Sequence, residues 1–322
     1  MLADLARDAI GRRQALLSAL PETDCVRLFH GATEGVAGLT VDRYGPILLI
    51  QTFREPLTAA QLDALMSVYD AALMPVYNHR GEATDVALPE PNAAALADHV
   101  GHELGLRFLV RARHRGKDPL LFLDFRAGRR WVRANCQGQS VLNLFAYTCG
   151  IGVAAAAGGA ETVWNVDFAA SALNVGRDNA TLNGVSMTFI ETDAIPALRQ
   201  LSGLGVKGRG ARRRRFKKLP ARQFDRVILD PPTWATTPFG AIDIVRDYPA
   251  LFKPAILATA PGGQLLATNH VSTVTLEGWL DTLRRCAQKA GRPIRQLHVL
   301  TPEADFPSPD GKHPLKMAIV EV

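Results

Sequence analysis

The first 120 residues mix helical and alternating patterns of apolar side chains. Residues 4–20 repeat Leu, Ala and Ile at helical spacing up to Pro21, and residues 57–72 return to that spacing. Strands are expected where β-branched and aromatic residues gather, at 25–30, on both sides of a Tyr-Gly-Pro turn within 39–53, at 74–78 and at 106–112. Residues 95–104 indicate a brief helix or an irregular stretch. These elements predict a small α+β domain over residues 1–120.

From residue 121 onward, strands alternate with helices, which is typical of a parallel, doubly wound sheet. The expected strands are 141–144, 163–167, 185–192, 226–229 and 264–268. The expected helices are 126–135, 153–158, 169–183, 194–201, 248–258 (ending at Pro261-Gly262-Gly263) and 276–290. Two further strands, 294–300 and 316–322, follow with no helix between them, so they predict an antiparallel hairpin at the end of the sheet. The second domain is therefore α/β and covers residues 121–322.

The composition indicates a globular protein without a membrane or metal partner. Hydrophobic residues make up 47% and charged residues 21% of the 322 positions, which is ordinary for soluble domains. No apolar run reaches the roughly 20 residues that span a bilayer, and the N-terminus lacks the apolar core of a secretory signal. The cysteines stand apart, without metal-ligand spacing, at Cys25, Cys136, Cys149 and Cys286. We expect a cytoplasmic protein with reduced thiols.

The positive charge is concentrated in one insertion, residues 207–223. This tract holds nine basic residues and no acid. The whole chain has a net charge of +6, so the residues outside the tract have a net charge of −3. A local basic tract is typical of contacts with phosphates, and we expect it to bind RNA. The candidate RNA-binding residues are Arg212, Arg213, Arg214, Arg215, Lys217 and Lys218. The alternative is a solvated insertion that only aids solubility.

Polar residues at the ends of the predicted parallel strands suggest a nucleotide site. Open α/β sheets bind ligands at the carboxyl ends of their strands, and the turn after the first strand carries Gly150 and Gly152, which let the backbone approach a ligand. Asp167 follows about 20 residues later, at the spacing suited to ribose hydroxyls. Asp193 could accept a hydrogen bond from an adenine amino group. Each acid could instead cap the following helix.

The fourth strand ends in Asp230-Pro231-Pro232. Consecutive prolines lack N–H groups and fix φ, so they form a stiff loop whose carbonyls can face a bound base. Trp234 could stack on that base, or it could be a core or lid aromatic. A nicotinamide enzyme has no use for this loop. The succession of glycine turn, acid-ended strand and Asp-Pro-Pro therefore predicts a methyltransferase that uses S-adenosylmethionine and works mainly by positioning the acceptor.

Over residues 25–322 the chain resembles the bacterial large-subunit (23S) ribosomal RNA methyltransferase family, which has 5-methylcytosine and 7-methylguanine branches. The resemblance rests on the segments 35–45, 121–126, 141–148, 230–233 and 245–248. It implies a class I, Rossmann-like methyltransferase sheet, the cofactor S-adenosyl-L-methionine and an RNA acceptor. The cofactor-binding residues that it implies are Asp124, Arg126, Phe145, Tyr147, Thr148, Gly150, Asp167, Phe168, Asp193, Ala194 and Asp230.

Two departures from the family's pattern bear on the chemistry. The family's Thr-Gly-Gly turn is Thr148-Cys149-Gly150 here. Methylation of cytosine at carbon 5 needs a thiolate, yet no cysteine follows the fifth strand, where Asn269 and His270 stand. The chain is therefore more similar to the 7-methylguanine branch, whose ring nitrogen already carries a lone pair.

The expected function is methyl transfer from S-adenosylmethionine to a nucleobase of RNA, with ribosomal RNA as the expected partner and without a cysteine nucleophile. The candidate catalytic residues are Asp230, Pro231, Pro232 and Asn269. His270 is either a general base or a local hydrogen-bonding residue. Two alternatives stay open: another acceptor (DNA, protein or a small molecule), or a non-catalytic RNA-binding protein of the same fold. The methylated atom and the oligomeric state are also open.

Overall fold

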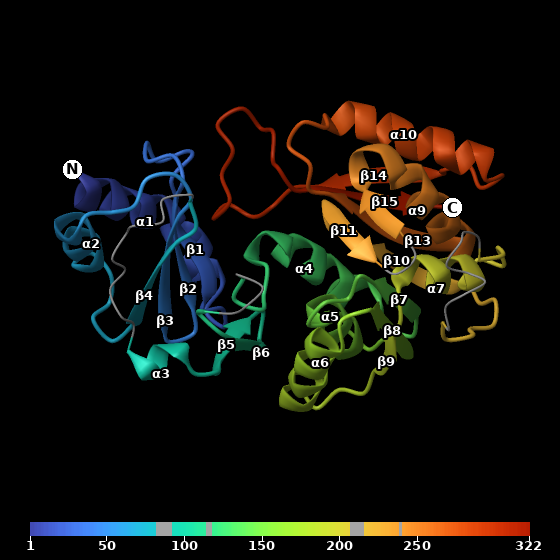
Figure 1. Ribbon diagram of the computed structural model, residues 1–322, viewed down its shortest axis with the longest axis horizontal. Coiled ribbons are helices and arrows are strands. Elements are labelled where there is room, and N and C mark those ends of the chain that lie inside the picture. Colours follow the sequence, from blue (N-terminus) through green and yellow to red (C-terminus); the bar gives the residue numbers. More distant parts are fainter. Residues whose placement is uncertain (82–91, 114–117, 207–215, 238–239) are drawn as a thin grey trace. The chain divides into compact units, whose positions relative to one another are not determined.

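The computed structural model describes residues 1–322 except 82–91, 114–117, 207–215 and 238–239 (Figure 1). The chain forms two compact units. Unit 1 comprises Met1–Arg126 and Pro302–Gly311, and unit 2 comprises Ala127–Thr301 and Lys312–Val322. The sequence placed the domain boundary at residue 120 and assigned residues 302–311 to the second domain. Three-dimensional contacts group that late segment with unit 1 instead.

Unit 1 is built on a four-stranded sheet in the order β1-β2-β3-β4, in which only β3 and β4 run parallel. Its strands are β1 (Cys25–His30), β2 (Leu39–Tyr44), β3 (Ile47–Thr52), β4 (Met74–His79), and the hairpin pair β5 (His99–Glu103) and β6 (Leu106–Val110). Its helices are α1 (Leu2–Ala19), α2 (Ala59–Met66), α3 (Ala93–Leu96) and the short 3-10 helix η1 (Leu123–Phe125). Apolar residues of α1 and α2 pack with β1, β2 and β3 in the core of this unit.

The prediction of a brief helix or irregular stretch over 95–104 was wrong for its second half. His99–Glu103 is a strand that pairs with β6, and Leu104 and Gly105 turn the chain with φ of 55° and 73°. Two positive φ values at a two-residue connection suit the twist of a hairpin. The polar residues in the strand hid its alternating pattern, because Glu103 is buried through an ion pair with Arg126.

Asp305 fastens the segment 302–311 into unit 1. Its carboxylate accepts hydrogen bonds from both terminal nitrogens of Arg126, at 3.0 Å each, and from the backbone N–H of Arg27 at 3.1 Å. The guanidinium of Arg126 also donates to Glu103 and Glu303, at 3.2 Å each. Both Asp305 and Arg126 are completely buried. Residues far apart in the sequence thus share one buried ionic network.

Unit 2 contains a seven-stranded sheet in the order β14-β15-β13-β10-β7-β8-β9. Strands β13, β10, β7, β8 and β9 pair in parallel, and β15 alone of the seven runs in the opposite direction, antiparallel to both of its neighbours, β13 and β14. The strands are β7 (Ser140–Leu144), β8 (Thr162–Asp167), β9 (Thr188–Glu191), β10 (Phe224–Leu229), β13 (Thr259–Asn269), β14 (Gln296–Leu300) and β15 (Lys316–Glu321). This arrangement confirms the predicted doubly wound sheet and its terminal antiparallel hairpin.

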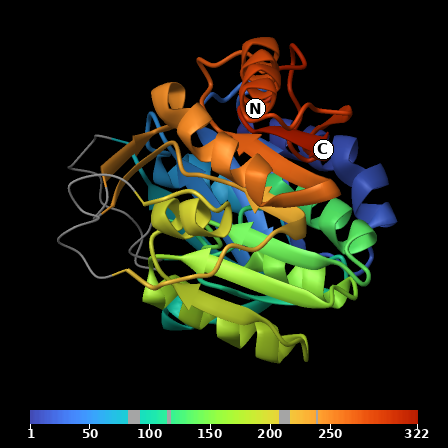
Figure 2. The same cartoon turned by 90° about the vertical axis from the view of Figure 1, so that its right-hand side faces the viewer.

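Helices cover both faces of this sheet. The helices of unit 2 are α4 (Arg126–Asn135), α5 (Gly150–Ala157), α6 (Ala170–Leu182), α7 (Ala194–Leu201), α9 (Ile244–Ala258) and α10 (Leu276–Lys289). Figures 1 and 2 show the yellow to orange-red helices α7, α9 and α10 on one face and the green helices α5 and α6 on the other. Leu142 and Leu144 of β7 belong to the core with α7, α9 and α10. No helix in the described ranges is long and apolar enough to cross a membrane.

The face under α5 contains a polar pair. Asn143 of β7 donates its amide N–H to Asn165 Oδ1 of β8 at 2.9 Å, and both side chains are buried. A Cβ added at Gly152 would lie 2.2 Å from Asn165 Oδ1. Gly152 therefore lets α5 approach β8 closely, so its lack of a side chain already has a packing reason apart from ligand approach.

Tertiary packing also changed three boundaries near β10 and β13. A short hairpin, β11 (Trp234–Thr237) and β12 (Gly240–Asp243), follows the prolines and was not predicted. Helix α9 starts at Ile244 because the Asp243 side chain caps it. Strand β13 includes Pro261-Gly262-Gly263, where the sequence pattern had predicted a turn between a helix and the next strand.

Candidate functional site

The parallel strands of unit 2 end together along one edge. The register pairs Leu144 of β7 with Val166 of β8 and with Leu229 of β10, and it pairs Leu229 with Ala267 of β13. The loops after these strands carry the acids and prolines that the sequence predicted as a site. One edge of the sheet therefore presents the predicted cofactor-binding and catalytic residues of unit 2 together.

The loop after β7 is conformationally strained. Phe145, Tyr147 and Cys149 have φ of 57°, 47° and 61°, a region that costs a residue with a side chain about 1–2 kcal/mol. Backbone hydrogen bonds hold the loop, from Ala146 N–H to Val166 O at 3.1 Å and from Cys149 N–H to Ala146 O at 2.7 Å. Strain of this kind persists where the surroundings enforce it, often at functional sites. The loop keeps a left-handed turn at Cys149 although this residue carries a side chain.

Cys149 is a packing residue in this loop. Its side chain is buried, and a Cβ added at Gly176 of α6 would lie 2.5 Å from its sulfur. Burial raises the pKa of the Cys149 thiol far above its usual range, and the charge of Asp167 adds to this effect. Next to it, Thr148 is buried and its carbonyl accepts a hydrogen bond from Asn179 at 3.0 Å, while Gly150 begins α5.

Asp167 links two loops at the end of β8. Its carboxylate accepts hydrogen bonds from the backbone N–H groups of Tyr147 and Ala169, each at 2.9 Å. Only 7% of the residue is exposed, and burial raises its pKa although these backbone donors oppose the shift. Phe168 follows with 50% of its surface exposed. A buried carboxylate with two oxygens and four lone pairs still has capacity for further donors, such as hydroxyls.

Asp193 has one carboxylate oxygen that no described residue engages in a hydrogen bond. One oxygen, Oδ1, caps α7 by accepting from Ile195 N–H at 2.8 Å. The other, Oδ2, is buried and has no hydrogen-bond partner among the described residues. An unsatisfied buried acceptor is costly, so this atom suits a donor supplied by a ligand. Ala194, also predicted to line the site, is the first residue of α7 and is buried.

Asp230 pairs with two side chains from the adjacent strand. Its Oδ1 accepts a hydrogen bond from Thr268 Oγ1 and lies 2.8 Å from His270 Nε2. The backbone carbonyl of Thr268 in turn accepts from the Tyr248 hydroxyl at 2.8 Å. Sequence reasoning missed Thr268 and did not connect His270 to Asp230. The signal was available in principle, because β10 and β13 are neighbours and Leu229 lies opposite Ala267.

Asn269, the last residue of β13, is buried, and its Oδ1 accepts from Val271 N–H at 2.9 Å. The Lys316 ammonium donates to the carbonyl of Val271 at 2.8 Å and to that of Pro314 at 3.0 Å. Lys316 is itself buried, and burial lowers its pKa. These contacts fix the turn that presents Asn269 and His270.

The Asp-Pro-Pro loop is half covered. Pro231 is buried, whereas Pro232 is exposed. Trp234 at the start of β11 has 62% of its surface exposed, so it is not a core aromatic. An exposed ring close after the prolines is suited to stacking.

Two predicted cofactor residues lie in unit 1. Asp124 is in η1, and Arg126 ends the first segment of that unit. Burial opposes the charge on Arg126, but Asp305 and Glu103 outweigh it and raise the pKa of the guanidinium further. Arg126 donates at least five hydrogen bonds inside unit 1, including one to the carbonyl of Cys25 at 2.6 Å. Its guanidinium thus has a structural function in unit 1.

The predicted RNA-binding residues are described only in part. Arg212, Arg213, Arg214 and Arg215 lie outside the described residues. Lys217 and Lys218 are exposed and precede the start of β10, so they belong to the edge of the sheet opposite Asp230. Within the described part of the chain, no cluster of His, Cys, Asp and Glu is suited to a metal ion.

Known proteins of similar sequence span nearly the whole chain. The profile of a family described as S-adenosylmethionine-dependent methyltransferase matches residues 26–319. A ribosomal RNA large subunit methyltransferase I from Aeromonas hydrophila is 30% identical over 317 residues, which are 94% of this chain and 73% of that protein. A ribosomal RNA large subunit methyltransferase from Deinococcus radiodurans is 31% identical over 306 residues, with coverage of 90% and 71%.

Solved structures share the fold at lower sequence identity. A proposed S-adenosylmethionine-dependent methyltransferase from Streptococcus mutans superposes with a TM-score of 0.79 at 21% identity, covering 100% of this chain and 81% of that one. An S-adenosylmethionine-dependent methyltransferase from Agrobacterium tumefaciens gives a TM-score of 0.64 at 20% identity, covering 88% of each chain. At these identities the likeness concerns the fold.

Proposed function

This chain belongs to the S-adenosylmethionine-dependent methyltransferase family, and we propose that its acceptor is a nucleobase of large-subunit ribosomal RNA. Its methyl donor is S-adenosylmethionine. Support for the acceptor comes from the relatives at 30% and 31% identity, which are named ribosomal RNA methyltransferases. The concentrated basic tract supports the same acceptor, because nucleic acids present a row of phosphates.

The residues at the carboxyl edge fit an adenosyl ligand. Asp167 would accept hydrogen bonds from the ribose hydroxyls, because its buried carboxylate retains acceptor capacity beyond its two backbone donors. Asp193 Oδ2 would accept from the adenine amino group, which would satisfy an otherwise unpaired buried oxygen. The half-exposed ring of Phe168 is placed between these acids in sequence and would contact the base. Bound S-adenosylmethionine supplies an electrophilic methyl group at this edge.

We propose that the acceptor atom is a purine ring nitrogen, as in the 7-methylguanine branch. The observation that supports this proposal is the set of residues around Asp230. Thr268 and His270 contact Asp230, and Asn269 is the last residue of β13. The end of β13, where a cytosine methyltransferase would need a thiolate, therefore contains no cysteine. A ring nitrogen attacks with its own lone pair and needs only orientation. Asp230, stiffened by Pro231 and Pro232, would orient the base through hydrogen bonds.

The four cysteines support a route without covalent catalysis. All are buried: Cys25, Cys136, Cys149 and Cys286. Burial raises the pKa of each thiol, to about 12 for Cys136. A thiol with a raised pKa carries little thiolate at neutral pH, and the thiolate is the nucleophile.

Nucleoside mass spectrometry tests the proposal. Ribosomal RNA from a strain that lacks this gene would be incubated with the purified protein and methyl-labelled S-adenosylmethionine, then digested to nucleosides. The expected product is a labelled methylpurine. Labelled 5-methylcytidine would contradict the argument from the missing thiolate, and label found only with DNA, protein or small-molecule acceptors would contradict the choice of RNA.

A further inference from the structure

The last part of the basic tract, residues 216–223, is held in place by unit 2. The side-chain amide of Gln200 in α7 donates to the carbonyl of Lys217 and accepts from Leu219 N–H, each at 3.1 Å. Arg222 N–H donates to the carbonyl of Leu201 at 2.9 Å. A charge run that serves only to keep a loop solvated does not need such fixed backbone contacts. This stretch is therefore an ordered part of the surface.

The cations of this stretch are not neutralised by ion pairs. Lys217 and Lys218 are exposed, and neither forms a salt bridge with a carboxylate in the residues that the structure describes. This edge carries the three cations Lys217, Lys218 and Arg222 against the two acids Glu161 and Asp225. The Asp225 carboxylate stays charged and accepts hydrogen bonds from the backbone N–H and the hydroxyl of Ser140, at 2.8 and 2.6 Å, and not from these cations. The edge therefore keeps an excess of positive charge.

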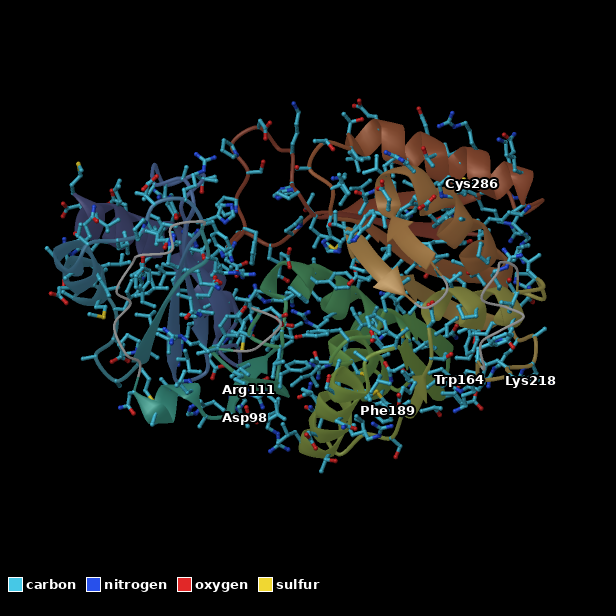
Figure 3. All side chains as sticks on the ribbon, in the orientation of Figure 1. Asp98, Arg111, Trp164, Phe189, Lys218 and Cys286 are labelled. Atoms are coloured by element: carbon cyan, nitrogen blue, oxygen red, sulfur yellow. The ribbon has the colours of Figure 1, made fainter. Side chains whose placement is uncertain are left out.

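Arg222 packs against two aromatic rings that contact each other edge to face. Its guanidinium carbon lies 4.8 Å from the ring centroids of both Trp164 and Phe224, and Nη2 donates to Thr162 Oγ1 at 3.3 Å. Cation–π contacts and a neutral hydroxyl hold the guanidinium without neutralising it. Figure 3 labels Trp164 on β8 and Lys218 on the segment that precedes β10. Arg222 thus adds a third, oriented positive charge to the two lysines.

These cations lie at the opposite edge of the sheet from Asp230. Thr162 begins β8 and Phe224 begins β10, so both mark the amino ends of parallel strands. Strand β10 has six residues, which at about 3.3 Å per residue make it about 20 Å long. A nucleotide bound at Asp230 is therefore too far away to contact Lys217 or Lys218 itself.

We propose that Lys217, Lys218 and Arg222 form a distal anchor for the phosphates of an RNA segment other than the one that carries the target base. The inference rests on the proposed function and narrows its substrate class to a folded RNA that spans both edges of the sheet. A mononucleotide or a short single strand around the target base would not reach the anchor. The two lysines act as point charges toward phosphates, and Arg222 adds directional donors.

The test compares Lys217→Ala/Lys218→Ala with a control of equal charge change, Lys253→Ala/Lys289→Ala, whose lysines are exposed on α9 and α10. Binding of full-length large-subunit ribosomal RNA would be measured at several salt concentrations. Each lost phosphate contact lowers the salt slope by about 0.7, so the slope should fall by about 1.4, which weakens binding about 25-fold at 0.1 M salt. Methylation of nested RNA fragments and calorimetry with S-adenosylmethionine would be run in parallel.

The expected result is weaker binding and a higher KM for full-length RNA in the Lys217/Lys218 variant alone, with unchanged cofactor affinity and unchanged methylation of the shortest active fragment. Equal salt slopes for the two double variants, while the wild type methylates RNA, would overturn the anchor and leave the proposed function standing. Failure of the wild type to methylate any RNA would refute the proposed function itself, and the anchor with it.

Discussion

Replacement of Asp305 by Asn should destabilise unit 1 selectively. The Asp305 carboxylate accepts three hydrogen bonds, two from the Arg126 guanidinium and one from Arg27 N–H, in a fully buried setting. Asn keeps the shape but loses the charge, and it turns an N–H₂ group toward donors. Removing one partner of a buried ion pair typically costs about 3–5 kcal/mol. Because Glu103 and Glu303 still pair with Arg126, we expect about 3 kcal/mol.

The distribution of tryptophan makes the effect separable by unit. All four tryptophans belong to unit 2: Trp131, Trp164, Trp234 and Trp279. Tryptophan fluorescence in a urea titration therefore reports unit 2, whereas far-ultraviolet circular dichroism reports both units. With a urea dependence of about 2 kcal/mol/M, the loss of about 3 kcal/mol shifts the unit 1 midpoint by about 1.5 M. The dichroism curve of the variant should become biphasic, with an early phase that the fluorescence does not show.

Asp310→Asn is the matched control, because Asp310 lies on the same segment and is exposed. Its midpoint should stay close to that of the wild type, as for ordinary surface substitutions. A dichroism curve of Asp305→Asn that coincides with both wild type and control would refute the view that this network holds segment 302–311 in unit 1.

Three further outcomes are expected. Asp193→Asn should keep the helix cap and the unfolding midpoint but weaken the binding of S-adenosylhomocysteine about 10- to 100-fold, as measured by calorimetry. The variant and the wild type should bind the inosine analogue, which lacks the amino group, with equal affinity. An equal loss of affinity for both ligands would contradict the assignment of Asp193 to the adenine amino group. Cys149→Ala should retain RNA methylation, and abolished turnover in a protein that still binds cofactor would implicate the thiol. Burial lowers the pKa of Lys316 below its ordinary 10.5, so its contribution to stability is lost as pH falls through the folded-state pKa. In urea titrations, the free energy of unfolding of the wild type, compared with that of Lys316→Met, should therefore increase as the pH rises toward 10.5. A difference between the two proteins that does not change with pH would contradict the lowered pKa of Lys316.

Local signals were sufficient for the main elements of unit 2. Alternating strands and helices predicted the parallel sheet, and two late strands without an intervening helix predicted the antiparallel hairpin of β14 and β15. The hairpin of β11 and β12 was missed because Pro231 and Pro232 suggested a simple loop. Strand β5 was missed because buried Glu103 breaks the polar-apolar alternation.

Only the part of the candidate site that lies at the ends of the parallel strands could be predicted from the sequence. Asp167, Asp193 and Asp230 could be predicted to share one edge because each stands at or just after the end of an apolar strand, and parallel strands end at one edge. Arg126 was expected at the cofactor, yet its donors are engaged with Asp305, Glu303 and Glu103. The pair Arg126–Asp305 joins positions 179 residues apart, and no local pattern encodes such a contact.

Sequence alone determined the class of sheet, the acids at its strand ends and the absence of a cysteine after β13, because each follows from residue types at short spacing. Tertiary structure alone decided which of those groups still have hydrogen-bonding capacity. Asp230 engages Thr268 and His270, whereas Asp193 keeps a buried oxygen without a partner among the described residues. The reason is physical: burial and hydrogen-bond saturation depend on neighbours from distant parts of the chain, which come together only when the sheet forms.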